Sequence, residues 1–323
     1  MSENPRISIV IPTCRRPQLL LECIESILRS DFTNFEILVV DQDPNQTLRS
    51  ALSDKFNRDS RISYLFLAEA ALDKARNIGV ANARGEIIVF VDDDIEVDVG
   101  WLSAYADAFS RVDPAPGVVG GRLDGRWLSK KPRWLPEEQE YLLGIYDRDG
   151  ELGPMQGGDL PIGANFAVLR EVFDKTGKFD ERIDYSYARR ASMLAGGDSL
   201  FALKAKQANY AVYYQPYARA WHKIAKGKLT KRYWLKRNFW GGVTIVVVLY
   251  LSGSAPAQSF PGIIRIHLHE IGRHIWYFFR PKSRSLRSNI TLPQAWMRLA
   301  GECAHSLGVI YISLKFLLTH NLP

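Results

Sequence analysis

The chain has 323 residues, enough to bury a sizeable core, and this length fits one large domain or one domain with an appendage. Hydrophobic residues make up 46% and charged residues 24% of the composition, which excludes a disordered or collagen-like chain. The net charge of +7 conceals an asymmetry, because residues 1–222 hold 27 Lys and Arg against 33 Asp and Glu (−6), whereas residues 223–323 hold 15 against 2 (+13).

Strand and helix patterns alternate in the first half of the chain. Apolar, β-branched runs predict strands at Ile7–Thr13, Glu36–Asp41, Ile62–Leu67 and Glu86–Val91, and helices are predicted from Pro17 and around Asp73–Ala83. Continuous apolar strands separated by helices indicate a mostly parallel sheet with helices on both faces. Ligands of such sheets bind at the carboxyl ends of the strands. Thr13, Asp41 and Asp92–Asp94 all fall at such ends.

Three consecutive aspartates, Asp92–Asp94, end the fourth strand. Adjacent carboxylates repel one another, and the repulsion grows as solvent is lost. Alternate side chains of an extended chain face the same way, so Asp92 and Asp94 are predicted to point together into one site. Oxygen ligands suit Mg²⁺ or Mn²⁺, and a divalent ion relieves the repulsion. A turn whose aspartates cap the following segment is the alternative interpretation.

An irregular segment separates two regions of α/β pattern. A helix near residues 99–112 and a short strand at 118–123 precede the segment, and strand and helix patterns continue from Ala164 to His222. Residues 126–163 are rich in Pro and Gly and carry four aromatic residues, which is typical either of a lid beside a site or of a surface insert. These aromatic residues are Trp127, Trp134, Tyr141 and Tyr146.

The character of the chain changes after His222. Basic residues interleaved with Tyr233 and Trp234 precede a run of 13 apolar residues, Phe239–Leu251, which is shorter than the ~20 residues that span a bilayer. The apolar run fits a buried core helix. The basic residues favour contact with an anionic membrane surface, and packing or a homo-oligomer contact is the alternative. The basic residues are Lys223, Lys226, Lys228, Lys231, Arg232, Lys236 and Arg237.

A second apolar pattern near the C-terminus predicts an amphipathic helix, because apolar residues recur at three- and four-residue spacing. We therefore expect residues 223–323 to form a basic, helical C-terminal region. Nucleic acid is not an expected partner, because no recognition motif accompanies the charge. The apolar residues are Leu292, Trp296, Leu299, Cys303, Leu307, Ile310, Leu314 and Leu317.

The N-terminal sequence and the cysteine pattern indicate the cellular compartment of the protein. MSENPRISIV has no basic region followed by an apolar run, so no secretory signal is expected and the cytoplasm is the expected location. Cys14, Cys23 and Cys303 show neither metal-ligand spacing nor an even-numbered framework, which fits a reducing compartment. We interpret all three as packing residues.

Several stretches, in order and spacing, resemble the family 2 glycosyltransferases of the GT-A fold. ISIVIPT, EILVVDQDP and ALDKARNIGVANARGEIIVFVDDD resemble the nucleotide-binding half of that family, and IGANFAVLREVFDKTGKFDERI and LAGGDSLFALKAKQANYAVYYQPYARAWH resemble its acceptor half. The resemblance covers about residues 6–222. It implies a Rossmann-like α/β GT-A domain at 1–222, with a nucleotide-binding half at about 6–123 and an acceptor half at about 124–222, followed by the helical region 223–323.

The resemblance also implies roles for residues on the donor side. Pro12 and Thr13 would lie along the nucleotide, and Asp41 would accept a hydrogen bond from the nucleobase. Arg76 and Asn77 would face the nucleotide and its phosphates, for which a guanidinium is a suitable partner.

The metal, base and acceptor positions follow from the same resemblance. Asp92 would reach the ribose, Asp94 would bind the Mn²⁺ or Mg²⁺ that bridges the diphosphate, and His222 would approach the metal or the diphosphate. Asp198, in GGDS, stands where the family has its general base. The acceptor side would be lined by Gly163, Ala164 and Asn165.

One position departs from the family pattern. Gly197 stands where the family commonly has an acidic residue, which leaves the site with one fewer negative charge. Asp198 also fits a helix N-cap, a role that is compatible with a general base.

A histidine packed beside Trp221 is the alternative interpretation of His222.

We therefore predict an inverting glycosyltransferase that moves a sugar from a nucleotide-sugar donor, with UDP or dTDP as first guesses, to a saccharide or lipid-linked acceptor. The predicted setting is bacterial cell-surface polysaccharide or glycolipid synthesis, at the inner face of the cell membrane. One alternative is a GT-A-like nucleotidyltransferase, which would favour a Gly-rich phosphate loop where Cys14–Pro17 has basic residues without glycines. The other is a catalytically silent binding protein, for which Gly197 is the only hint.

Overall fold

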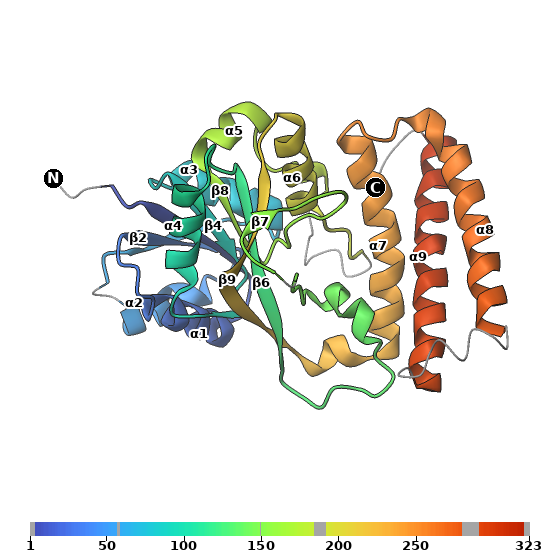
Figure 1. Cartoon of the computed structure of the whole chain (residues 1–323). Helices are drawn as coiled ribbons and strands as arrows, with labels where there is room; N and C mark the ends of the chain where they lie inside the picture. Colours follow the sequence, from blue (N-terminus) through green and yellow to red (C-terminus); the bar gives the residue numbers. More distant parts are fainter. Residues whose placement is uncertain (1–3, 57–58, 149, 184–191, 280–290, 320–323) are drawn as a thin grey trace. The chain divides into compact units, whose positions relative to one another are not determined.

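A computed structural model describes residues 4–56, 59–148, 150–183, 192–279 and 291–319 of the chain (Figure 1). The chain forms two compact units. The first unit comprises Met1–Arg126, Tyr146–Arg190 and Gly197–Lys223, and the second comprises Trp127–Ile145, Ala191–Gly196 and Ile224–Pro323. The predicted acceptor half, residues 124–222, is thus divided between the two units.

A mixed β-sheet forms the centre of the first unit (Figure 1). Its strands lie in the order β3-β2-β1-β4-β8-β6-β9-β5, with β7 paired to β9. The pairs among β3, β2, β1 and β4 are parallel, as the sequence predicts, whereas β8, β5 and β7 pair antiparallel with their neighbours. The strands are β1 (Ile7–Thr13), β2 (Phe35–Asp41), β3 (Ile62–Phe66), β4 (Ile87–Val91), β5 (Ile95–Val97), β6 (Val118–Trp127), β7 (Gly153–Pro154), β8 (Asn165–Leu169) and β9 (Val212–Ile224).

The strand register collects polar residues at one edge of this sheet. Thr13 and Asp41 are paired in the parallel register of β1 and β2, so both strands end at the same level. Because β8 runs antiparallel to β4, its first residue, Asn165, lies opposite the last residue of β4. The pairing of β5 with β9 places His222 opposite the residue that directly follows Asp94. Residues far apart in the sequence therefore meet at the carboxyl ends of the parallel strands.

Helices cover both faces of the sheet. One apolar core joins the sheet to α1, α2 and α4, and a second joins it to α3, α5 and α6. Because successive side chains of a strand point to opposite faces, Ile9 belongs to the first core and Val10 to the second. The short elements α2 and β5 have no counterpart in the sequence prediction. The helices are α1 (Pro17–Leu28), α2 (Thr47–Phe56), α3 (Leu72–Asn82), α4 (Trp101–Arg111), α5 (Arg170–Thr176), η2 (Glu181–Ile183) and α6 (Gly197–Gln207).

Three long helices form the body of the second unit. α7 and α9 approach closely at two glycines. The approach leaves no room for a Cβ, which at Gly242 would lie 2.0 Å from the His305 carbonyl oxygen and at Gly308 would lie 1.9 Å from the Phe239 carbonyl oxygen. The predicted apolar run is part of α7, where several of its valines are buried. Within the described ranges no helix is long and apolar enough to cross a bilayer. The elements are η1 (Glu137–Leu143), η3 (Lys226–Leu229), α7 (Lys231–Leu251), η4 (Ala257–Ser259), α8 (Phe260–Phe279) and α9 (Leu292–Thr319).

The predicted amphipathic helix is confirmed as α9, but most of its predicted apolar stripe is exposed. Leu299 is buried, whereas the stripe residues Leu292, Trp296, Leu307, Leu314 and Leu317 are exposed. Small residues take much of the buried side instead, because they allow the close approach of α7. They are Ala295, Gly301, Ser306, Gly308 and Ser313.

The irregular segment 126–163 is more packed than its composition suggests. Trp134 packs edge-to-face on Trp234, with ring centroids 6.2 Å apart, in an apolar cluster of the second unit. Tyr146 packs on Tyr214 in the first unit, with centroids 5.8 Å apart. Of the four aromatic residues, Tyr141 is exposed and the other three are at least half-buried. The aromatic residues therefore serve packing in both units.

Candidate active site

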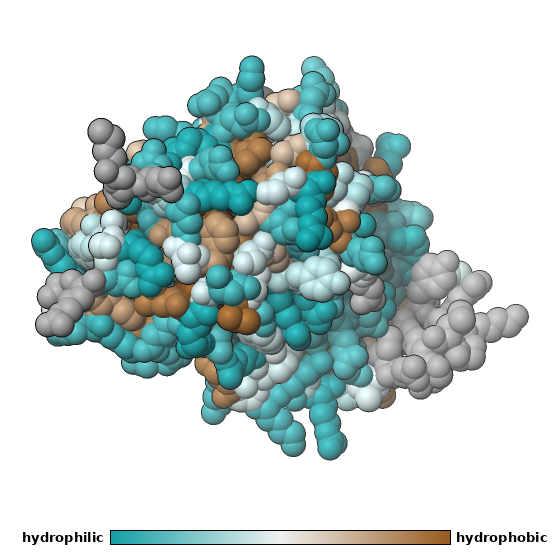
Figure 2. All heavy atoms as spheres, turned by 60° about the vertical axis from the view of Figure 1, so that its left-hand side comes forward, coloured by the Kyte–Doolittle hydropathy of each residue, from teal (hydrophilic) through white to brown (hydrophobic). Residues whose placement is uncertain are grey.

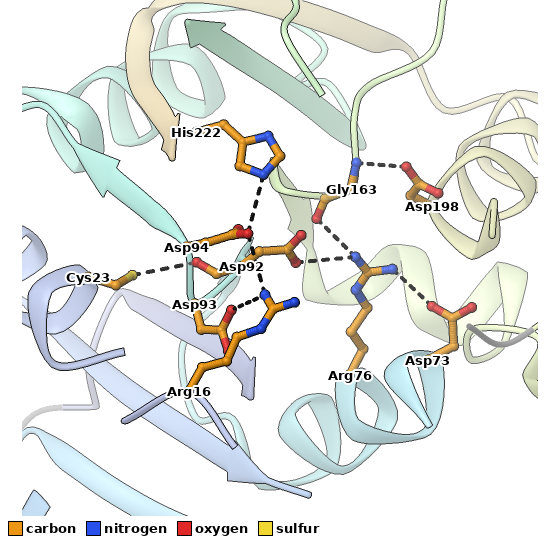
Figure 3. Close-up of polar contacts among 10 residues, drawn as sticks. All are labelled: Arg16, Cys23, Asp73, Arg76, Asp92, Asp93, Asp94, Gly163, Asp198 and His222. Atoms are coloured by element: carbon orange, nitrogen blue, oxygen red, sulfur yellow. Dashed lines mark hydrogen bonds and ion pairs between the residues drawn. The ribbon is translucent and has the colours of Figure 1, made fainter. Parts of the chain in front are cut away.

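The three consecutive aspartates lie in a turn between β4 and β5 (Figure 3). The turn ends the extended conformation after Val91, so strand alternation does not apply to these residues, and a common direction of Asp92 and Asp94 stays a prediction. Asp93, the middle residue, is buried, and its Oδ2 accepts a hydrogen bond of 2.8 Å from Thr13 Oγ1. Burial raises the pKa of Asp93 to about 6. Each of the three carboxylates has its own set of partners.

Arg16 and His222 both contact Asp94. Arg16 Nη1 lies 3.1 Å from Asp93 Oδ1 and 3.4 Å from Asp94 Oδ2. His222 Nε2 lies 3.4 Å from the same Asp94 oxygen. The Arg16 guanidinium therefore offsets the mutual repulsion of two carboxylates that are almost fully buried. Sequence analysis did not select Arg16 for the site, although a basic pair directly after the first strand was visible.

Asp94 and His222 fit two ligand positions of one divalent ion. An oxygen and a nitrogen 3.4 Å apart suit neighbouring ligands at bond lengths of about 2.1 Å. In the described part of the chain, no group of three or more His, Cys, Asp or Glu side chains is arranged to hold a metal. An ion here would therefore complete its coordination with phosphate oxygens and water, as Mg²⁺ commonly does in phosphate-binding enzymes. The donor set fits Mn²⁺ or Mg²⁺ bound together with a diphosphate.

Arg76 of α3 is a buried cation that connects three parts of the site (Figure 3). Its Nη1 donates to Asp73 Oδ1 at 2.9 Å, and its Nη2 donates to the Gly163 carbonyl oxygen at 3.0 Å. Nη2 also lies 3.9 Å from Asp92 Oδ1. Burial alone would lower the pKa of Arg76, but the carboxylates of Asp73, Asp92 and Asp198 outweigh burial and raise it. These are positioning contacts, and the predicted contact of Arg76 with phosphates stays a prediction.

Asp198, the predicted base, is the second residue of α6 and is oriented by a distant loop. Its Oδ2 accepts a hydrogen bond of 2.6 Å from the Gly163 N–H. Gly163 thus binds Asp198 with its N–H and Arg76 with its carbonyl oxygen. A Cβ at this position would lie 2.8 Å from both Arg76 Nη2 and Asp198 Oδ2, so any other residue at position 163 would displace at least one of these two side chains. The predicted base is in this way linked to the aspartate turn.

Gly197 leaves room for a carboxylate from another helix. A Cβ at position 197 would lie 1.8 Å from Asp73 Oδ2 and 2.4 Å from Asp73 Cγ. The negative charge that the sequence lacks at position 197 is therefore present in space as buried Asp73 of α3. Sequence analysis missed Asp73. The available signal was an acidic residue three positions before Arg76, which places both on one helix face.

The residues predicted to bind the nucleotide lie at the ends of β1 and β2. Pro12 and Thr13 are buried at the carboxyl end of β1. Asp41 is fully buried, with Oδ2 accepting from Tyr64 Oη and Oδ1 from the Asp43 N–H, both at 2.9 Å. Burial raises the pKa of Asp41. The structure brings these residues to the predicted edge, and their contact with a nucleobase stays a prediction.

Other predicted site residues make internal contacts. Asn77 exchanges hydrogen bonds with the backbone of Phe179 at 3.0 and 2.9 Å. Asn165 accepts from two aromatic side chains of α4 and donates to two backbone carbonyls, so its amide is fully used within the fold. Ala164, between Gly163 and Asn165, is also buried. Ligand contacts by Asn77, Ala164 and Asn165 stay predictions.

Comparison with solved structures identifies the fold. The mannosyltransferase PcManGT from Pyrobaculum calidifontis, in complex with GDP-Man and Mn²⁺, is similar with a TM-score of 0.55 at 17% identity, covering 100% of this chain and 78% of that chain. A mixed sheet with aspartates at the ends of its parallel strands, followed by a helical region, agrees with this similarity. The fold is that of the GT-A glycosyltransferases.

The family follows from the sequence itself. Residues 8–177, more than half of the chain, match the family described as "Glycosyl transferase family 2", and the protein belongs to that family. A glucosyl-dolichyl phosphate glucuronosyltransferase from Haloferax volcanii is 24% identical over 79% of this chain and 82% of its own length. A GalNAc(5)-diNAcBac-PP-undecaprenol beta-1,3-glucosyltransferase from Campylobacter jejuni is 35% identical over 39% of this chain and 44% of its own length. The predicted base and His222 lie outside the matched range.

Proposed function

We propose that this protein is an inverting glycosyltransferase that moves a sugar from a nucleotide-sugar donor to a hydroxyl group of a saccharide or lipid-linked acceptor. The donor in this proposal is a UDP- or dTDP-sugar. The product belongs to a cell-surface polysaccharide or glycolipid, and the reaction takes place at the inner face of the cell membrane.

The observation that carries this proposal is the chain of contacts from the aspartate turn to Asp198. Arg76 lies beside Asp92 and donates to Gly163, and Gly163 donates to Asp198. A carboxylate held in this way can accept a proton from an acceptor hydroxyl, while the aspartate turn binds the diphosphate side of the donor. A single in-line displacement between these two sides inverts the anomeric centre.

Asp94 and His222 are the residues that would hold a divalent ion with the donor. When bound, such an ion neutralises charge on the leaving diphosphate. Arg16, which lies beside Asp93 and Asp94, can turn its guanidinium towards a phosphate when that charge arrives. Gly163 and Asp73 then keep Asp198 and Arg76 in place, because neither hydrogen bond depends on the ion.

The acceptor class in this proposal draws on the names of the relatives. The Haloferax volcanii protein is named for glucosyl-dolichyl phosphate and the Campylobacter jejuni protein for an undecaprenol-linked saccharide. Both names contain a polyprenol-linked sugar. We therefore include a lipid-linked saccharide as the acceptor to test first.

The experiment is a screen of nucleotide sugars with Mn²⁺ and a lipid-linked saccharide acceptor, in which released nucleoside diphosphate is measured. We expect release from at least one UDP- or dTDP-sugar, and a product whose anomeric configuration, read by NMR, is opposite to that of the donor. Retention would refute the inverting mechanism. Release of pyrophosphate from a nucleoside triphosphate would show a nucleotidyltransferase, and donor binding without any release would show a silent binding protein.

A further inference from the structure

The helix α9 exposes a row of large apolar side chains on one side, although its other side also buries apolar residues such as Leu299, Ile312 and Phe316. The exposed residues recur on one side of the helix and are 45% to 81% exposed. They form what we call the outer α9 face: Leu292, Trp296, Leu307, Tyr311, Leu314 and Leu318. On the buried side, Gly301 lies against Asn238 and Gly308 against the Phe239 backbone. A helix on a water-exposed protein surface usually has polar residues on its outer side, so a row of exposed large apolar side chains marks a surface that a partner covers.

The contact between α8 and α9 contains polar groups beside two aromatic pairs, Phe278 with Trp296 and Phe260 with Phe316. His267 Nδ1 lies 3.2 Å from Ser306 Oγ, and His274 Nδ1 lies 3.0 Å from Glu302 Oε2. Burial lowers the pKa of His267, which favours the neutral ring in this contact. Hydrogen-bonding side chains between helices, with large apolar side chains on the outer side, also occur in helices that contact lipid.

The helices of this unit are nevertheless not membrane spans. No described helix has the length and apolarity needed to cross a bilayer. The 28 residues of α9 would extend about 42 Å at 1.5 Å per residue, so the helix can lie along a membrane surface over its whole length. A helix in that orientation inserts its apolar face into the boundary between headgroups and acyl chains.

The charge of this region favours an anionic partner over a second copy of the chain. Residues 223–323 hold 15 Lys and Arg against 2 Asp and Glu. Both acids pair within the helices that carry them, Glu270 with Arg273 and Glu302 with Arg298. The remaining positive charge would repel an identical unit and would attract an anionic lipid surface.

We propose that the outer α9 face docks on an anionic membrane surface. This inference deepens the membrane part of the proposed function, and it rests on the exposed apolar residues of α9 together with the net positive charge of residues 223–323. It also differs from the sequence prediction, which assigned membrane contact to the basic run 223–237. Within that run, Lys223 is buried and pairs with Glu22 at 2.6 Å, and Trp234 is fully buried. The longest row of exposed large apolar residues lies on α9 instead, and α8 carries further ones.

Liposome flotation tests the proposal. The full chain is mixed with phosphatidylcholine vesicles that contain increasing fractions of phosphatidylglycerol, at low and high salt. We expect wild-type protein to float with the anionic vesicles at low salt and less at high salt, because screening weakens the attraction. Leu307→Gln with Leu314→Gln should lower the vesicle partition coefficient ~10-fold or more, since two apolar contacts with the boundary region are lost.

The matched control is Val99→Gln with Leu128→Gln, which removes two equally exposed apolar side chains outside α9. This control should float like the wild type, and circular dichroism should show that both double variants keep their helices. Equal flotation of the α9 variant and the wild type, or no flotation of the wild type on anionic vesicles, would refute the proposal. So would a wild-type dimer that the α9 variant converts to a monomer without any change in flotation. Asp198→Asn should float normally, so a failure of membrane docking is distinguishable from a failure of the proposed transfer reaction.

Discussion

The two compact units differ in which side chains they bury and which they expose: the first buries charged side chains, and the second exposes large apolar ones. Among the described residues, every buried charged side chain lies in the first unit, and the clearest group surrounds the aspartate turn. In the described part of that unit three large apolar side chains are exposed, namely Phe66, Val99 and Tyr217, against fourteen in the described part of the second unit. A view of the molecule that brings the sheet side forward shows hydrophilic side chains over much of that face, with scattered apolar patches (Figure 2).

This difference indicates that the first unit serves the reaction and the second unit serves binding to a surface. Buried charges hold one another at fixed distances and provide an organised electrostatic environment for a reaction. Exposed apolar side chains are unfavourable in water, and their burial against a partner is favourable. We therefore expect substitutions in the first unit to change chemistry with little effect on surface binding, and substitutions in the second unit to do the reverse. The following predictions test that expectation, from the largest effect to the smallest.

Asp94→Ala should abolish measurable transfer and metal-dependent nucleotide binding, because Asp94 and His222 are the two groups placed to hold an ion with the diphosphate. Calorimetry with nucleoside diphosphate and Mn²⁺ measures the binding. Asp107→Ala, which removes an aspartate paired with Arg111 on α4, is the control and should bind normally. Unchanged metal-dependent affinity in Asp94→Ala would show that the ion binds elsewhere.

Asp198→Asn should lower turnover ~10²-fold or more while donor binding stays nearly intact, since loss of a general base acts on the transition state. The asparagine oxygen can still accept the Gly163 N–H, so the loop should keep its position. Turnover and donor affinity are measured separately by steady-state kinetics and calorimetry. Near-normal turnover would assign the proton transfer to another residue.

Gly197→Ala should lower both activity and stability, because its Cβ would lie 1.8 Å from Asp73 Oδ2. Displacement of a buried carboxylate of this kind should cost ~1–3 kcal/mol in the free energy of unfolding. The sharper test is a double-mutant cycle with Asp73→Ala, measured by urea unfolding. The two losses should be less than additive, since the second substitution removes the clash. Full additivity would contradict the assignment of that space to Asp73.

Gly308→Ala should destabilise the second unit by ~1–3 kcal/mol, because its Cβ would lie 1.9 Å from a backbone oxygen of α7 that cannot move like a side chain. Donor binding by the first unit should not change. Gly272→Ala on α8 is the control, since nothing lies near that position. It should be neutral or stabilising by up to ~1 kcal/mol, as expected for alanine in a helix. Thermal unfolding followed by circular dichroism distinguishes the two variants.

Arg16→Gln should tighten Mn²⁺ binding in the absence of nucleotide by a factor of roughly 3–10, because a guanidinium 3.4 Å from Asp94 Oδ2 repels a second cation. Titration calorimetry with Mn²⁺ alone measures this effect. Arg15→Gln, next to it in the sequence but paired with Asp43, is the control. Weaker Mn²⁺ binding in Arg16→Gln would show that Arg16 orders the carboxylates instead of competing for them.

Local patterns predicted much of the fold and part of the site. The strand at Ile7–Thr13 and the helix from Pro17 are confirmed with their bounds, because apolar runs and a proline at the helix start act through neighbours in the chain. The three-residue β5 was missed, since its identity depends on pairing with β9. Asp73 and Arg16 were missed for the same kind of reason, because each acts on residues that are distant in the sequence.

The sequence by itself determined which residue types stand at the ends of which strands. Aspartates directly after an apolar strand belong to the carboxyl edge of the sheet in any α/β arrangement, and an apolar periodicity determines that α9 is a helix. The tertiary structure decided which groups meet. A carboxylate at residue 73 fills the space beside Gly197, and Gly308 lets α7 approach α9 so closely that small residues share the buried side of α9 while Leu307 and Leu314 stay exposed. Both outcomes depend on shape complementarity between segments far apart in the chain, and periodicity within one segment carries no information about the shape of its partner.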